Sequence, residues 1–473
     1  GGVVVTGEGA ARADVLVNKG KVTEISSDLS DRQTSRTIDA SGKYVLPGVV
    51  DAHAHPVYGD KMDDYSICAA FGGITTIIAF IGNVSAWGYT GYTPEVAKRF
   101  IEDSERISYT DFSVHGVFVG EDDVENAIPE LIDLGVISFK MFMAYSRRGM
   151  MMPDDKMLRA MQIASYNGGL AMVHAENGHC IDFLVDNFIA TGKTNPEYFL
   201  RSQPNIIEAE AFNRALTYAE VTGCPLYGVH LSTKESLPIL RMFQERGQMA
   251  FGETCPHYLA LTNDEVLTKG ALGKVATPLR EWSDVMALWA ALGDGLLSTV
   301  GSDSTGLTVA QKRTGGQSGT LSLDRGDKME EPVSIFDARF GLNTLQYMSS
   351  VVFTEGVQKG HISLARFVQV MCENPAKIFG IYPQKGTLKP GSDADLVIWD
   401  SELSGTASIE HMKGNGDFCT FENFQLQGMP TLTMQRGNVI VEDGKLVAQQ
   451  GHAHYVPGNP GRAAYAPGAE RVE

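Results

Sequence analysis

The sequence predicts an α/β protein in which a (β/α)8, TIM-like barrel carries a small β-sandwich domain formed from both termini. Two observations support this fold class. Eight apolar, strand-like segments alternate with amphipathic, helix-like segments through the middle of the chain, and short strands with Gly, Asp and Ser breaks occur at both ends. Repeated strand–helix alternation favours a closed parallel barrel over an open sheet. Similar β-rich ends around one central block indicate one domain assembled from both.

The first part of the predicted β-sandwich covers residues 1–46. Three segments in it alternate apolar and polar side chains, as strands with one buried face do. These segments are residues 13–17, 21–25 and 36–40. The chain begins with Gly1 and lacks both an initiator Met and the charged-then-apolar layout of a signal peptide, which is consistent with a trimmed start or a missing upstream segment.

The predicted catalytic barrel covers residues 47–383. Its expected strands are residues 48–55, 74–80, 112–119, 137–143, 170–174, 226–230, 249–254 and 298–303. Helical periodicity in segments such as residues 94–107 and 208–222 fills the intervals between them. Residues 304–333, after the eighth strand, are rich in Gly, Ser and Thr and show no clear period. So long a loop is more often functional than idle.

The second part of the predicted β-sandwich covers residues 384–446, and a C-terminal arm follows over residues 447–473. Strand-like segments recur in the first of these ranges, at residues 395–399, 431–434 and 439–445. The final range is rich in Gly, Pro and Ala, a composition typical of an extended arm or a disordered end.

The overall composition excludes several classes of function. The chain has 473 residues and a formal charge of −18, which argues against nucleic acid or an anionic membrane surface as a partner. No apolar run approaches the ~20 residues of a membrane span. The six cysteines are scattered without a C-x-x-C pair, as expected for reduced thiols in the cytoplasm.

The first candidate for chemistry is the pair His53 and His55, which follows the apolar residues 44–50. Side chains two residues apart on a strand project from the same face, so two imidazoles at a strand end can bind one metal ion. Alone the pattern is weak, because His-x-His also occurs by chance on half-buried strands.

Other polar residues end further strands of the predicted barrel: His174 after the fifth, His230 after the sixth and Asp303 after the eighth. Lys140 lies inside the otherwise apolar fourth strand. Each has an ordinary explanation by itself, but the carboxyl ends of barrel strands meet at one face, where active sites form. So many uncompensated polar groups would be costly to bury, and metal ions relieve that cost.

The lysine predicts a two-metal site. A protonated amine beside divalent cations would be repelled, and burial with adjacent cations lowers the pKa of Lys140. The neutral amine can add CO₂ and form a carbamate, N6-carboxylysine, whose two oxygens can bridge two metals. The predicted ligands of the first ion are His53, His55, Asp303 and the carbamate of Lys140, and those of the second are the same carbamate, His174 and His230.

Nitrogen and oxygen ligands without thiolate suit Zn²⁺ best, with Mn²⁺ or Co²⁺ as alternatives. Cys180 and Cys255 each lie near a candidate histidine, but the histidines already supply the ligands, so a metal role for either thiol is disfavoured. A water molecule acidified between the two ions is the expected nucleophile.

Six motifs together point to a known family. They are residues 48–55 (GVVDAHAH), 70–76 (AFGGITT), 139–145 (FKMFMAY), 174–178 (HAENG), 255–259 (CPHYL) and 385–397 (KGTLKPGSDADLV). On these residues the chain resembles the amidohydrolase superfamily over almost its whole length, and within it the dihydropyrimidinase/hydantoinase group. The resemblance implies binuclear, metal-dependent hydrolysis of a cyclic amide C–N bond, of the dihydropyrimidine or hydantoin type, to an N-carbamoyl amino acid. It also implies a homo-oligomer, a tetramer or a dimer, with the C-terminal arm as a candidate contact.

The resemblance also implies roles for individual residues. Tyr145 would donate a hydrogen bond to the amide oxygen as it becomes an oxyanion, and Asp303 would carry a proton to the leaving ring nitrogen. The loops that hold the ring through backbone groups correspond to Ala276 and Arg325. His257 either supports the metal ligands from behind or is structural.

The chain departs from its family around the ring. Asp303 is followed by Ser304 where the family usually has His, residues 276–280 read ATPLR instead of SPPLR, and residues 323–326 read LDRG where a Pro-Asn-Gly loop is usual. Arg147 and Arg148 follow Tyr145 directly. They are either part of a solvated loop or recognise an anionic substituent of the substrate.

Two other functions stay open at this point. An allantoinase- or dihydroorotase-like enzyme would use the same metal site on a different substrate ring, although those relatives resemble this chain less at Tyr145. A non-catalytic scaffold on the same fold would have lost metal ligands, and this sequence retains all six positions.

Overall fold

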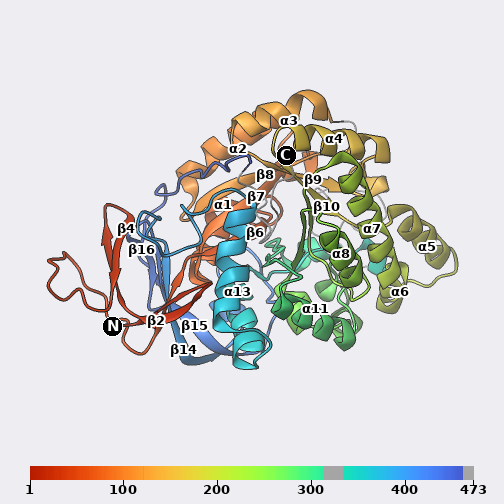
Figure 1. Ribbon diagram of the computed structural model, residues 1–473. Coiled ribbons are helices and arrows are strands. Elements are labelled where there is room, and N and C mark those ends of the chain that lie inside the picture. The colour runs from red at the N-terminus through yellow and green to blue at the C-terminus, as the bar shows by residue number, and fades with distance from the viewer. Residues whose placement is uncertain (121, 314–333, 462–473) are drawn as a thin grey trace.

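Eight parallel strands form one continuous sheet in chain order in the computed structural model, which describes residues 1–120, 122–313 and 334–461 (Figure 1). The strands are β6 (Val49–Ala54), β7 (Ile74–Gly82), β8 (Asp111–Val117), β9 (Ser138–Phe142), β10 (Leu170–His174), β11 (Leu226–Gly228), β12 (Ala250–Thr254) and β13 (Thr299–Val300). A parallel bridge joins Ala54 to Ser304, and the Asp303 N–H donates to the His53 carbonyl at 3.0 Å. These contacts bring the last strand end beside the first, so the predicted TIM-like barrel is confirmed.

Helices surround the barrel and bury apolar side chains against it. In α2, buried Val96, Ala97 and Phe100 share a face while charged residues occupy the other. The larger outer helices are α1 (Met62–Phe71), α2 (Thr93–Ile107), α3 (Val124–Asp133), α4 (Asp154–Tyr166), α5 (Gly178–Ala190), α6 (Pro196–Ser202), α7 (Asn205–Thr222), α8 (Ser236–Glu245) and α11 (Trp282–Asp294). Shorter helices are α9 (Pro256–Ala260), α10 (Asp264–Lys269), α12 (Val309–Lys312), α13 (Met348–Val352), α14 (Leu364–Val368) and α15 (Asn374–Ile378). None of the helices in the described ranges is long and apolar enough to cross a bilayer.

Both ends of the chain contribute to a separate seven-stranded sheet, ordered β17-β16-β15-β14-β5-β1-β2, beside the barrel (Figure 1). Its strands are β1 (Val3–Thr6), β2 (Gly9–Arg12), β5 (Tyr44–Pro47), β14 (Leu396–Thr406), β15 (Gln425–Gln435), β16 (Asn438–Glu442) and β17 (Lys445–Leu446). β14 from the C-terminal half pairs antiparallel with β5 from the N-terminal half. A two-stranded sheet, β3 (Asp14–Asn18) and β4 (Lys21–Ser26), packs against the same small core.

Two details differ from the expected β pattern. Residues 36–40 form no strand, although Ile38 and Ala40 still pack against the core of the terminal sheet. The apolar residues 44–50 instead contain two strands, β5 in the terminal sheet and the start of β6 in the barrel, with Gly48 between them. A Cβ at Gly48 would lie 2.0 Å from Thr75 Oγ1, so only glycine allows the chain to pass so close to β7.

A buried ion cluster fastens the terminal sheet to the barrel. Lys385 Nζ lies 2.5 Å from an oxygen of Asp111, which begins β8, and 2.7 Å and 3.0 Å from oxygens of Asp395 and Asp393 beside β14. All four side chains are buried. Burial opposes the charge of the Lys385 amine, but the three carboxylates raise its pKa above the ordinary value, so it remains a cation.

The described part of the C-terminal segment lies on the chain's own barrel. The Phe112 N–H donates to the His454 carbonyl at 3.2 Å, and the Val456 N–H donates to the Phe112 carbonyl at 2.8 Å. Tyr455 Oη donates to the Leu134 carbonyl at 3.0 Å, next to α3. Residues 447–461 are therefore ordered against β8 and α3 (Figure 1).

Candidate active site

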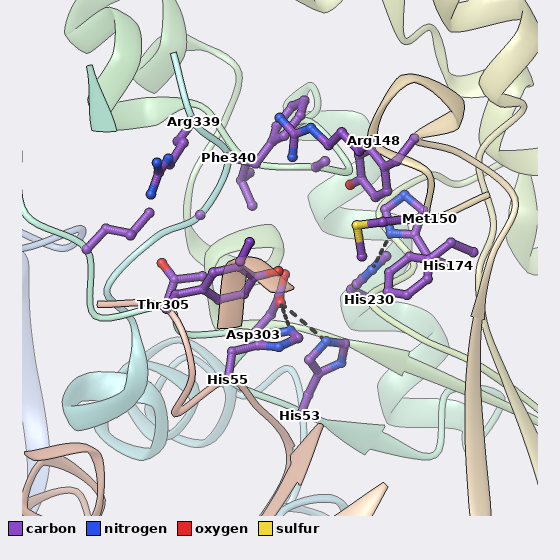
Figure 2. Close-up of a pocket in the computed structure, with 18 of the residues that line it drawn as sticks. His53, His55, Arg148, Met150, His174, His230, Asp303, Thr305, Arg339 and Phe340 are labelled. Carbon is purple, nitrogen blue, oxygen red and sulfur yellow. Dashed lines mark hydrogen bonds and ion pairs between the residues drawn. The ribbon is translucent and has the colours of Figure 1, made fainter. Parts of the chain in front are cut away.

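One cavity opens at the carboxyl ends of the barrel strands (Figure 2). The candidate residues that line it are His53, His55, Lys140, Tyr145, His174, His230, Ala276 and Asp303. They come from six of the eight strands or the loops that follow them, because a parallel barrel brings all its carboxyl ends to one face. Arg325, the remaining candidate, lies outside the described residues.

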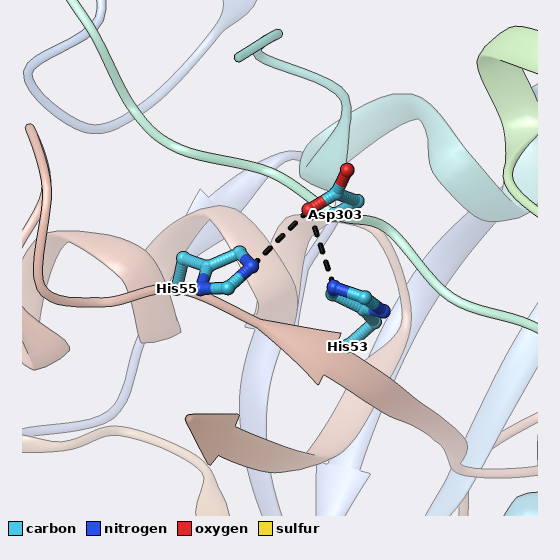
Figure 3. A group of neighbouring side chains, drawn as sticks. All are labelled: His53, His55 and Asp303. Atoms are coloured by element: carbon cyan, nitrogen blue, oxygen red, sulfur yellow. Dashed lines mark ion pairs between the residues drawn. The ribbon is translucent and has the colours of Figure 1, made fainter. Parts of the chain in front are cut away.

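The first group in the cavity is His53, His55 and Asp303 (Figure 3). Asp303 Oδ1 lies 3.2 Å from His53 Nε2 and 3.1 Å from His55 Nε2. All three side chains are buried, and their possible ligand atoms lie within 4.8 Å of one another. Two imidazole nitrogens and a carboxylate oxygen converging on one point fit a divalent cation of the zinc type.

The second group is His174, at the end of β10, and His230, two residues after β11. His174 Nδ1 lies 2.9 Å from His230 Nε2, and both side chains are buried. Two imidazoles whose nitrogens converge at this distance can ligate one further cation. The His53 and His230 rings are 5.3 Å apart, so the two groups are neighbours in the same cavity.

Lys140 projects from β9 into this cavity and is 2% exposed. Its Nζ lies 4.9 Å from the centre of the Phe80 ring and 5.4 Å from that of Phe142. Burial lowers the pKa of Lys140 to about 8, although the charges of Asp303 and Glu253 act in the opposite direction. A buried amine with a lowered pKa is the state in which lysine acts as a nucleophile.

Two buried glutamates that the sequence argument missed hold the histidines. Glu253, on β12, lies 2.6 Å from His53 Nδ1 and accepts hydrogen bonds from the His230 N–H at 3.0 Å and from Tyr227 Oη at 2.7 Å. Glu176 lies 2.8 Å from His174 Nε2. Each carboxylate fixes one ring nitrogen and so directs the other nitrogen of that ring into the cavity. The sequence offered a signal for each glutamate. Glu176 is part of the HAENG motif, and Glu253 is a carboxylate near the end of a buried strand.

Glu253→Gln is expected to weaken metal binding by about 10–100-fold, because the amide cannot hold His53 Nδ1–H as a carboxylate does. Chelator competition would measure the affinity. Glu208→Gln is the matched control, since Glu208 is also buried and accepts from Ser232 and Arg280 but touches no candidate ligand. Equal losses in the two variants would contradict the role of Glu253.

Tyr145 stands beside the second group, with its ring 4.9 Å from that of His174. Burial raises the pKa of Tyr145 well above its ordinary value, so the phenol stays protonated. A protonated phenol at the cavity wall can donate a hydrogen bond to a substrate oxygen as charge develops on it.

Three of the candidate residues have strained backbones. Tyr145, His230 and Asp303 have φ of 67°, 41° and 47°, in the left-handed region that non-glycine residues rarely adopt. In the described chain the other non-glycine residues with positive φ all lie in the terminal β regions or their turns. Such strain persists only where the surroundings impose it, and its concentration at one cavity supports a functional role.

The substrate-contact predictions have mixed outcomes. Ala276 lines the cavity. Residues 323–326, where the Pro-Asn-Gly loop was expected, lie outside the described residues, and Arg339, Phe340 and Gly341 are among the described residues that line the cavity. Ser304, which replaces the usual His, accepts from the Thr344 N–H at 3.1 Å and does not line the cavity.

Other residues considered from the sequence lie outside the cavity wall. His257 is buried against Tyr258, their ring centres 4.2 Å apart, and neither of its ring nitrogens has a hydrogen-bond partner in the described ranges. Cys180 is exposed on α5, and Cys255 is buried; neither lines the cavity.

The two consecutive arginines face different environments. Arg147 is turned to α5, where Nη2 lies 2.7 Å from Asp186 Oδ2 and Nε lies 3.4 Å from Asp182 Oδ1. Arg148 lines the cavity beside Phe340 (Figure 2). Arg147 therefore forms ion pairs outside the cavity, whereas Arg148 is a cation at the cavity wall.

Comparison with known proteins gives one consistent family. Residues 44–440 match the amidohydrolase family. The D-hydantoinase of Ralstonia pickettii is 36% identical over 461 residues, which cover 95% of each chain. The L-hydantoinase of Paenarthrobacter aurescens is 36% identical over 464 residues, 96% of each chain. The crystal structure of dihydropyrimidinase from Brevibacillus agri superposes with a TM-score of 0.88 at 31% identity, covering 99% of this chain and 98% of that one. The extent of these matches shows that the chain belongs to the amidohydrolase family.

Proposed function

We propose that this protein is a metal-dependent hydrolase that opens a cyclic amide, of the hydantoin or dihydropyrimidine type, to an N-carbamoyl amino acid. The observation that carries the proposal is the convergence of His53, His55 and Asp303 with His174 and His230 in one cavity beside Lys140. Relatives named hydantoinase and a structural neighbour named dihydropyrimidinase support the choice of ring.

The amidohydrolase family implies a binuclear metal centre, and the donor set supports two Zn²⁺ ions, with Mn²⁺ or Co²⁺ as alternatives. We assign His53, His55 and Asp303 to one ion, His174 and His230 to the other, and a carbamate on Lys140 to both. Lys140 supports this assignment by its position, because a permanently charged ammonium could not remain between two cations. Bound cations would supply an acidified water and polarise the amide carbonyl.

The chain's own residues would then perform the remaining steps. Asp303 would accept the proton that the attacking water loses and return it to the ring nitrogen as the C–N bond breaks. Tyr145 would donate a hydrogen bond to the carbonyl oxygen as it becomes an oxyanion. Backbone groups at Ala276, with Arg325 as a further candidate, would hold the ring in place.

A hydrolysis screen tests the proposed function. The protein loaded with Zn²⁺ in the presence of bicarbonate would be assayed with dihydrouracil, substituted hydantoins, allantoin and dihydroorotate. We expect ring opening of a hydantoin or of dihydrouracil, detected as an N-carbamoyl amino acid. Turnover confined to allantoin or dihydroorotate would instead indicate an allantoinase- or dihydroorotase-like enzyme. A protein that binds no metal and opens no ring would favour the scaffold alternative.

We also propose an assembly state and a location for the protein. Exposed apolar side chains on α5 and α7, including Phe183, Ile189 and Ile206, support a homo-oligomer, a dimer or tetramer, which light scattering would measure. The six cysteines are all free, which supports a location in the reducing cytoplasm.

A further inference from the structure

Arg148 places a cation in the wall of the cavity, away from the candidate metal ligands. Its guanidinium carbon lies 5.4 Å from the centre of the Tyr145 ring and 5.2 Å from that of Phe340. Figure 2 shows Arg148 next to Phe340, across the cavity from His53 and His55. The two aromatic faces hold the planar group in position, as stacked guanidinium groups usually are.

The stacking leaves one edge of the guanidinium without a partner. Arg148 Nη2 is shielded from solvent and has no hydrogen-bond acceptor among the described residues. No described carboxylate forms an ion pair with Arg148 either, whereas its neighbour Arg147 has two. A shielded donor without an acceptor is unfavourable, and a carboxylate is the acceptor that fits the fork geometry of this group.

The charges around the cavity favour an anionic ligand at this end. Asp303, beside His53 and His55, is the sole carboxylate among the described residues that line the cavity. Arg148 lines the same cavity as a cation. In a chain of formal charge −18, a cation at the cavity wall without a paired carboxylate among the described residues is a local feature that favours an anionic ligand.

The position of Arg148 relative to Tyr145 indicates where the anion would lie. The centre of the Tyr145 ring lies 4.9 Å from that of His174 and 5.4 Å from the guanidinium carbon of Arg148, so Tyr145 is a neighbour of both groups. A group that reaches Arg148 would therefore lie close to the carbonyl to which Tyr145 would donate. A carboxylate one or two carbons from the ring matches that relation.

We propose that Arg148 binds a carboxylate on the ring substituent, so that the preferred substrates are cyclic amides with a short acidic side chain and the products are N-carbamoyl acidic amino acids. The inference rests on the proposed ring-opening function and deepens it.

The test compares two probe substrates of the same shape, hydantoin-5-acetic acid and hydantoin-5-acetamide, with the metal-loaded enzyme. We expect kcat/KM to favour the acid by about 10–100-fold, the range for a hydrogen-bonded charge pair. In Arg148→Gln this preference should fall to near unity, mainly through KM for the acid, because the anion lies away from the reacting atoms. Arg148→Lys keeps the charge without the fork and should retain part of the preference.

Arg147→Gln is the matched control, since it removes a neighbouring charge that is paired with Asp182 and Asp186 outside the cavity. It should leave the ratio unchanged. Equal kcat/KM for the two probes with the wild-type enzyme, or an unchanged ratio in Arg148→Gln, would overturn the inference while leaving the ring-opening function intact. A purely structural role of Arg148 would instead lower kcat for both probes equally. Failure to open any ring would overturn the proposed function and this inference with it.

Discussion

Lys140→Met is expected to reduce the bound metal below two ions per chain and to lower kcat by about 10³-fold or more. Methionine preserves the length and apolar character of the side chain inside β9 but cannot form a carbamate. In the proposed site, loss of the carbamate would remove the ligand shared by the two groups and the anion that would balance two adjacent cations. The acidified water that bound cations would supply would be lost with them, and a large loss of rate is therefore expected.

Metal analysis and turnover should be measured together on the same preparations. Lys385→Met is the matched control, because Lys385 is also a buried lysine but lies among Asp111, Asp393 and Asp395, outside the cavity. It should lower stability and leave metal content per folded chain unchanged. Wild-type protein stripped of metal should regain activity with Zn²⁺ only when bicarbonate is present. A Lys140→Met protein that still binds two ions and turns over normally would contradict the carbamate.

The barrel could be predicted from the sequence because each strand is a short apolar run that can be recognised from its own residues alone. β10 begins and ends where the pattern places it, at Leu170 and His174. The candidate ligands could be gathered for a related reason. Parallel strands of a closed barrel end on one face, so the topology alone predicts that polar residues at the strand ends lie close together.

The local sequence pattern was insufficient to predict the structure or role of a residue that depends on a partner far away in the sequence. Residues 36–40 alternate like a strand, yet no neighbouring strand is available to pair with them, and they lie as an extended segment on the terminal core. Glu253 has no sequence signal that connects it to His53, 200 positions earlier.

His115 shows that a histidine on a barrel strand need not belong to the site. It lies on β8, and its ring nitrogens contact Ser138 Oγ at 2.6 Å and the Ala52 carbonyl at 3.0 Å. Both nitrogens are used within the barrel core, so neither is available to a metal. Residue type and strand alone therefore do not identify a candidate ligand; the side chain must also line the cavity, as those of His53 and Lys140 do.

Asp303→Asn is expected to lower kcat by about 10³-fold while retaining most of the bound metal. The amide keeps an oxygen where Asp303 Oδ1 approaches His53 and His55, at 3.2 Å and 3.1 Å, so a ligand atom remains. What the amide cannot do is accept the proton of the attacking water and pass it to the leaving nitrogen. Turnover should be expressed per bound metal, so that loss of metal and loss of proton transfer are counted separately.

Comparison with Tyr145→Phe separates the two roles at the same carbonyl. In the proposed mechanism the phenol would supply one hydrogen bond to the developing oxyanion, so its loss should lower kcat by about 10²–10³-fold with either a good or a poor leaving group. The defect of Asp303→Asn should shrink when the leaving nitrogen is made more acidic, because protonation of that nitrogen then matters less. An Asp303→Asn defect that is independent of the leaving group would show that Asp303 acts only as a ligand, and the proton would have to travel by another route.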